Sequence, residues 1–84
     1  MTLQQLKYVI AIDRYRNFAK AAAELDVTQP TLSALLLKLE NELGVRLFER
    51  SNKCVRPTSF GKTVIRQAEK ILSQTELISE TIAE

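Results

Sequence analysis

Residues 28–44 form the best-delimited helix that can be predicted in this chain. Thr28 is a residue type that caps helix N-termini, and Pro30 falls in the first turn, where its missing N–H is not needed. Gly44 is expected to end the helix, because glycine readily adopts a left-handed C-terminal cap. Apolar residues at helical spacing form one stripe along it, which consists of Leu32, Leu35, Leu36, Leu39 and Leu43. This stripe predicts a core-facing side, and the opposite side presents Gln29, Pro30, Ser33, Ala34, Leu37 and Lys38.

A second helix is predicted immediately before it. Asn17 is a suitable N-cap for residues 18–25, whose alanines allow a neighbouring helix to approach closely. Only Asp26 and Val27 separate this helix from the Thr28 cap. Two helices joined by so few residues indicate a helix-turn-helix, over about residues 18–37.

Residues 47–50 and 54–57 are short strand-like runs on either side of the polar residues 51–53, which suit a turn. Pro57 is compatible with the end or edge of its strand. A small hairpin, or wing, is therefore predicted, with Arg50, Lys53 and Arg56 along it. The expected fold is mainly α: a winged helix-turn-helix of three helices and a two-stranded wing, followed by a long helix.

Both ends of the chain are predicted to be helical. Thr2 and Gln5 fit a capping box, and apolar spacing extends the first helix to about Arg14. Thr58 or Ser59 caps a last helix, at residues 59–84, whose apolar stripe is too long for 57 residues that already have their own core to cover. A second copy is the simplest partner, in a parallel or antiparallel coiled-coil homodimer. The expected dimer interface consists of Phe60, Val64, Ala68, Ile71, Thr75, Ile78 and Ile82.

Charge is distributed unevenly along the chain, although the net charge is only +2. Residues 1–44 carry five basic and five acidic groups, whereas residues 45–70 carry seven basic and two acidic groups. Residues 71–84 carry three glutamates and no basic group. A basic block beside an acidic end indicates a polyanionic partner such as nucleic acid, and an ordinary solvated surface is the alternative.

Composition excludes most catalytic and metal chemistry. The 84 residues include no histidine, one cysteine and two glycines, which excludes the usual zinc sites, histidine-dependent catalysis and glycine-rich phosphate loops. We expect a non-enzyme with no cofactor and no metal. Cys54, beside Lys53 and Arg56, is a candidate for redox or nucleophilic chemistry, with an incidental strand residue as the alternative. The absence of a signal-peptide pattern or a long apolar stretch predicts a cytoplasmic protein with no membrane partner.

The exposed side of the 28–44 helix suits double-stranded DNA. Free amides and the positive dipole end at a helix N-terminus favour a phosphate. Gln29 can bond adenine in a bidentate way, Ser33 can donate or accept, and small residues such as Ala34 can meet a thymine methyl. The basic residues of the wing can reach the DNA backbone or the minor groove. The expected DNA-binding residues are Thr28, Gln29, Pro30, Thr31, Ser33, Ala34, Lys38, Arg50, Lys53 and Arg56.

Taken together, these motifs resemble the LysR-type transcriptional regulators. The resemblance covers nearly the whole chain and rests on Asn17-Phe18, Ala22-Ala23, Leu25, Thr28-Gln29-Pro30-Thr31-Leu32-Ser33, Leu39-Glu40, Glu42-Leu43-Gly44-Val45, Leu47-Phe48-Glu49-Arg50, Pro57-Thr58 and Gly61. It implies a DNA-binding domain at residues 1–58 and a linker helix at residues 59–84, which pairs antiparallel in dimers that read an inverted-repeat operator. It also implies an effector-binding domain, absent from this chain, and a small-molecule or redox effector is expected only with that domain. The string from Thr28 to Ser33 resembles the peroxide-sensing branch of the family.

Three residues depart from the family pattern. Ala34 stands where members often carry an arginine, and Leu35 and Leu37 replace residues that are usually polar. Leu35 is expected in the core, whereas Leu37 is expected to point outward, toward either the first helix or a methyl group in a DNA groove. The alternative function is a scaffold for protein association through the long helix, without DNA binding.

Overall fold

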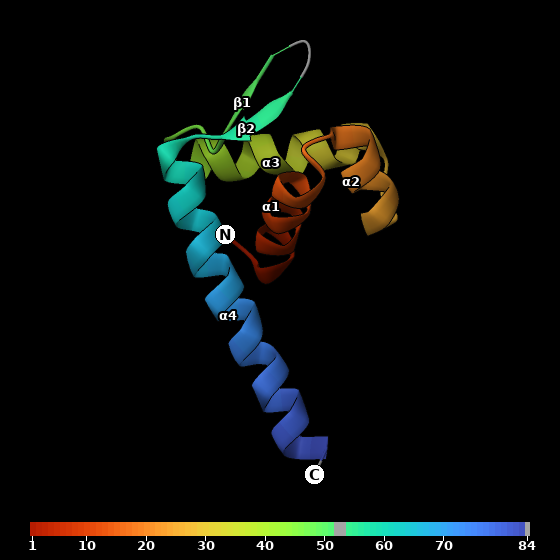
Figure 1. Cartoon of the computed structure of the whole chain (residues 1–84), viewed down its shortest axis with the longest axis vertical. Coiled ribbons are helices and arrows are strands. Elements are labelled where there is room, and N and C mark those ends of the chain that lie inside the picture. The colour runs from red at the N-terminus through yellow and green to blue at the C-terminus, as the bar shows by residue number, and fades with distance from the viewer. Residues whose placement is uncertain (52–53, 84) are drawn as a thin grey trace.

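The computed structural model describes residues 1–51 and 54–83, so the predicted wing residue Lys53 lies outside the described residues. Within these ranges the chain forms four helices and one hairpin, in the predicted order (Figure 1). The elements are α1 (Leu3–Tyr15), α2 (Phe18–Leu25), α3 (Gln29–Leu43), β1 (Phe48–Arg50), β2 (Val55–Pro57) and α4 (Ser59–Ala83).

Short-range contacts delimit the first helices, as predicted. The Thr2 hydroxyl accepts the backbone N–H of Gln5 at 3.1 Å, and Gln5 Oε1 accepts the N–H of Thr2 at 2.9 Å, which completes the capping box. Asn17 Oδ1 accepts the N–H of Lys20 at 2.9 Å at the start of α2. At the end of α3, Gly44 adopts a left-handed conformation with φ of 74°.

The turn between α2 and α3 depends on Asp26, which adopts a left-handed conformation with φ of 59°. Aspartate is one of the few non-glycine residues that visit this region readily. The N–H of Val27 then donates to the carbonyl of Ala22 at 3.0 Å, which closes the end of α2. The chain therefore reverses within the two residues that the sequence leaves for the turn.

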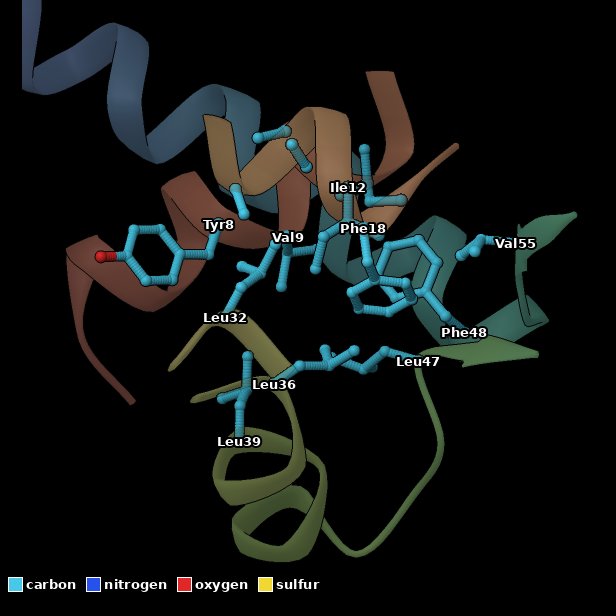
Figure 2. Packing of buried hydrophobic residues seen from close by; sticks show 14 residues of the cluster. Tyr8, Val9, Ile12, Phe18, Leu32, Leu36, Leu39, Leu47, Phe48 and Val55 are labelled. Atoms are coloured by element: carbon cyan, nitrogen blue, oxygen red, sulfur yellow. The ribbon is translucent and has the colours of Figure 1, made fainter. Parts of the chain in front are cut away.

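α1 lies at the centre of the fold and contacts α2, α3, α4 and β2. Figure 2 shows the apolar side chains that converge around it from the helices and from the base of the hairpin. The largest fully buried side chains are Val9, Ile12, Leu32, Leu39, Leu47 and Phe48. Leu36 is also buried and Leu35 is partly buried, but Leu43, the last residue of α3, is exposed. The predicted leucine stripe therefore joins the core as far as Leu39.

The hairpin pairs β1 with β2 in antiparallel register, with Phe48 opposite Pro57 and Arg50 opposite Val55. Pro57 is the last residue of β2, as its missing N–H predicts. Phe48 and Val55 are buried, whereas most of the other hairpin residues are exposed or half-buried. The base of the wing is thus part of the core, and the wing itself projects from the body over α3 (Figure 1).

A buried carboxylate connects α3 to the wing. Glu40 Oε2 accepts the backbone N–H of Leu47 at 2.7 Å and that of Phe48 at 3.4 Å. These two amides lie where the chain enters β1, and Glu40 is one of only two buried polar or charged residues found in the described part of the chain. The hydrogen bonds satisfy groups that would be costly to bury without partners.

Thr58 caps α4, which decides between the two candidates that the sequence left open. Its hydroxyl accepts the N–H of Gly61 at 3.0 Å and donates to the carbonyl of Arg46 at 2.6 Å. The N–H of Thr58 also donates to the carbonyl of Leu47 at 3.0 Å. The start of α4 is therefore bonded directly to the segment that leads into the wing.

The structure corrects the expectation that the domain leaves the whole apolar stripe of α4 uncovered. α4 packs along α1, and Ile65 and Ala68 are buried there, with Ala68 at 0% exposure. The reason is that α1 lies at the centre of the fold, and the side of α1 that does not contact α2 or α3 is covered by α4. The C-terminal half of α4 extends beyond the other helices (Figure 1). No helix within the described residues combines the length and the hydropathy that a membrane span requires.

Candidate nucleic-acid interface

The predicted DNA-contacting residues of α3 are accessible at the molecular surface. Six of the seven are exposed and Ser33 is half-buried. The buried leucines of α3 point the other way, toward α1 (Figure 2). The exposed set comprises Thr28, Gln29, Pro30, Thr31, Ala34 and Lys38.

The N-terminus of α3 is organised by Thr28. Its hydroxyl accepts the N–H of Thr31 at 3.2 Å and donates to Thr31 Oγ1 at 2.8 Å. Thr28 is thus engaged within its own helix turn, where it stabilises the end of α3. The Thr31 hydroxyl is the acceptor in this pair, so its own proton is not used in the bond and can donate to a ligand.

The wing places two of its predicted basic residues on the surface. Arg50 and Arg56 are exposed, and Arg56 pairs across the hairpin with Glu49. The guanidinium carbon of Arg50 lies 4.4 Å from the centroid of the Phe18 ring, at the start of α2. This cation–π contact restrains Arg50 between the wing and the helix-turn-helix.

Cys54 is half-buried and directly precedes β2. Its Sγ lies 3.6 Å from the hydroxyl of Ser51, and this hydrogen bond, with the positive charge of Arg56, lowers the pKa of the thiol. These neighbours stabilise a thiolate, but they supply no general base for catalysis.

An open hollow of about 600 Å³ lies between α3 and the wing. Two of its lining residues, Ser33 and Ala34, belong to the predicted α3 set, and Arg50 belongs to the predicted wing set. Arg46 and Asn41 also line it, although neither was among the expected DNA-binding residues. Leu37, for which the sequence left the first helix and a DNA groove as alternatives, lines it too. Asn41 was recognisable from its spacing, because it stands one turn beyond Leu37 on the same side of the helix.

The predicted dimer residues of α4 differ in how far they are exposed. Ala68 is buried within the molecule and Val64 is packed against the core, so Ala68 is not available to a partner in this arrangement. Thr75 is half-buried. The remaining four are exposed apolar side chains: Phe60, Ile71, Ile78 and Ile82.

Comparison with known proteins identifies the family. Residues 3–62 match the model of bacterial regulatory helix-turn-helix proteins of the lysR family, and this chain belongs to that family. A curated relative, the hydrogen peroxide-inducible genes activator of Haemophilus influenzae, is 39% identical over 80 residues, which span 95% of this chain. The match covers 27% of that relative's length, so this chain corresponds to about a quarter of it.

Solved structures agree with the fold. A full-length OxyR variant from Pseudomonas aeruginosa matches 99% of this chain with a TM-score of 0.91 and 43% identity, over 28% of its own length. The DNA-binding domain of BenM, in complex with benA site 1 DNA, matches 99% of this chain and 93% of its own length, with a TM-score of 0.94 and 35% identity. The resemblance to the lysR family and the prediction of a mainly α winged helix-turn-helix are both confirmed.

Proposed function

We propose that this chain is the DNA-binding part of a LysR-type transcriptional regulator and that it inserts α3 into the major groove of double-stranded DNA. The observation that carries the proposal is the exposed side of α3, which lies beside Arg46, Arg50 and the projecting wing. A helix with short polar and small side chains on its free side fits the major groove, and flanking arginines fit the phosphates. Residues 1–58 form the proposed DNA-binding unit and residues 59–84 the linker helix.

The proposed contacts follow from side-chain chemistry. Gln29 reads adenine, Ser33 bonds a base edge, and Pro30, Thr31 and Ala34 meet the base edges or a thymine methyl. Thr28 and the first amides of α3 hold a phosphate. The basic residues contact the backbone or the minor groove, and they are Lys38, Arg50, Lys53 and Arg56.

We further propose a homodimer in which the exposed apolar residues of α4 pair antiparallel with a second copy. The first half of α4 carries three basic residues and one acidic residue, which are Lys62, Arg66, Lys70 and Glu69, whereas the second half carries only Glu76 and Glu80. Antiparallel pairing brings the basic half of one helix beside the acidic half of the other, which parallel pairing does not. A two-fold dimer presents two copies of α3 and thus reads an inverted repeat.

The hydrogen peroxide-inducible genes activator of Haemophilus influenzae is much longer than the segment that this chain matches. We propose that any response to a small-molecule or redox effector resides in the corresponding remainder of the whole regulator. The contribution of residues 1–84 is then recognition of the operator.

A selection of bound sequences from a random duplex pool, at about 150 mM salt, tests DNA recognition. We expect enrichment of two inverted half-sites about one helical turn apart. Binding without enrichment that disappears as salt rises contradicts sequence-specific recognition. Salt-independent self-association with no DNA binding supports the alternative of a protein-association scaffold.

Two variants then separate base reading from phosphate binding. On the selected site, Gln29→Ala should lose about 1–3 kcal/mol of binding free energy and relax one base position. Lys53→Ala should weaken binding to all sequences alike and reduce the slope of log K against log salt by about one. Affinity measured over a salt series checks both, and wild-type behaviour of both variants contradicts the assigned contacts.

A further inference from the structure

Leu37 differs from the other leucines in the middle of α3. Leu32, Leu36 and Leu39 point into the core (Figure 2), whereas Leu37 is 55% exposed and lines the hollow between α3 and the wing. Exposed leucines are common, but this one lies on the side of the helix that carries the proposed base contacts. Ser33 stands one turn before it and lines the same hollow.

We propose that Leu37 is a specificity-determining residue that contacts the 5-methyl group of a pyrimidine in the major groove. This inference rests on the proposed DNA-binding function and deepens it. The methyl group belongs to thymine or to 5-methylcytosine, which present the same apolar group at the same place on the base.

The chemistry of the hollow supports a methyl group as the occupant. Leu37 and Ala34 form the apolar part of the α3 side of the hollow, and neither side chain has a polar atom to bond a base edge. The rest of that side is lined by the polar side chains of Ser33, Glu40 and Asn41. On the wing side, Arg46 and Arg50 line the same hollow. The guanidinium groups suit phosphates, which would bring the edges of the adjacent bases toward the apolar part.

Charge also argues for DNA over a protein partner at this place. Both arginines of the hollow lie in the basic segment of residues 45–70. An apolar protein surface covering Leu37 would have to desolvate Arg46 and Arg50 as well, whereas a DNA groove offers both a methyl group and phosphates. The Phe18 ring that restrains Arg50 further favours a ligand that needs this guanidinium in place.

The test uses the full chain and a duplex containing the selected operator. Each thymine is replaced in turn by deoxyuridine, which removes only the 5-methyl group, and the affinity is measured at constant salt. For the wild-type chain we expect one position in each half-site at which the replacement weakens binding about fourfold, the effect of losing one buried methyl group. For Leu37→Ala the same replacement should cause almost no further loss.

Leu43→Ala is the matched control, because Leu43 is also an exposed leucine of α3 and is not among the residues lining the hollow. This variant should keep the wild-type deoxyuridine profile. Thermal unfolding of Leu37→Ala checks that the exposed substitution leaves the fold intact. At the position where deoxyuridine weakens binding, duplexes with cytosine and with 5-methylcytosine are then compared. Tighter binding to 5-methylcytosine than to cytosine would show that Leu37 contacts the methyl group on either pyrimidine. Equally weak binding to both would show that the contact is specific for thymine.

The inference is overturned if no deoxyuridine replacement weakens binding of the wild-type chain. It is also overturned if Leu37→Ala loses affinity at the same deoxyuridine position, and to the same extent, as the wild type. Either result, with an operator selected and bound, leaves the proposed DNA-binding function in place. Failure to select any operator removes the proposed function instead.

Discussion

Gly61 shows how much a single missing side chain can decide. It lies in the first turn of α4, is buried, and donates its N–H to the Thr58 hydroxyl. A Cβ at this position would overlap the backbone carbonyl of Leu47, which cannot move away as a flexible side chain would. The helix comes this close to the segment before the wing only because residue 61 is glycine.

We therefore expect Gly61→Ala to lower the free energy of unfolding by about 3 kcal/mol, the upper end of typical overpacking costs. On an exposed helix the same change would stabilise by about 1 kcal/mol, so the sign of the effect tests the close approach. Urea denaturation measures it. Gly44→Ala serves as a comparison, because no atom lies within 4 Å of its would-be Cβ and only the strain of its φ of 74° opposes the change. A stabilised Gly61→Ala variant would contradict the packing described here.

At the scale of elements, the link between α3 and the wing depends on one carboxylate. Glu40 accepts two amides at the entrance to β1, and the same stretch is bonded to the start of α4 through Thr58. A helix and a hairpin that follow one another along the chain are thereby held in one relative orientation. In the proposed complex, this orientation sets where the wing meets the DNA when α3 is in the groove.

We expect Glu40→Ala to cost about 1–3 kcal/mol of folding free energy, since it leaves two buried amides without their acceptor. Glu40→Gln keeps an acceptor oxygen and should cost less. Urea denaturation gives the free energies, and amide hydrogen exchange of Leu47 and Phe48 reports the local loosening of the wing. Equal stability of the alanine and glutamine variants would show that the two hydrogen bonds contribute little.

At the scale of the whole molecule, the apolar residues of α4 fall into a buried set and an exposed set. Ile65 and Ala68 attach it to α1, and the following turns continue past the body of the domain. Ile71, Ile78 and Ile82 lie on a neighbouring side of the helix and are exposed. The domain therefore covers only the beginning of the helix, and the apolar side chains toward its end remain exposed.

We predict that Ile78→Asp dissociates the proposed homodimer without unfolding the domain, because Ile78 is 66% exposed and contributes nothing to the core. Leu77→Asp is the control: Leu77 is 50% exposed and adjacent in sequence, but it lies off the stripe. Sedimentation at tens of micromolar concentration measures the oligomeric state, and circular dichroism checks the fold. A wild-type monomer under these conditions, or dissociation by Leu77→Asp but not by Ile78→Asp, would contradict the proposed interface.

The sequence alone was sufficient for the elements and for most of their borders. Thr2, Asn17, Thr28 and Gly44 act on backbone groups within three or four residues of themselves, so their effect can be predicted without knowing the fold. The leucine spacing in the same way indicated which side of α3 faces the core. The family resemblance also followed from the order of residues, and the comparisons confirm it.

Other features depend on groups that lie far apart in the chain, and only the tertiary structure decided them. Residue spacing predicted the stripe of α4, but whether Ala68 faced a second chain or α1 depended on how the helices pack. The stacking of Arg50 on Phe18 joins residues separated by two helices, and the sequence carried no signal of it. Local hydrogen bonds and periodicity are encoded within a few residues, whereas burial is a property of the assembled core, and for that reason the sequence determined the elements while the fold determined which of their faces remain free.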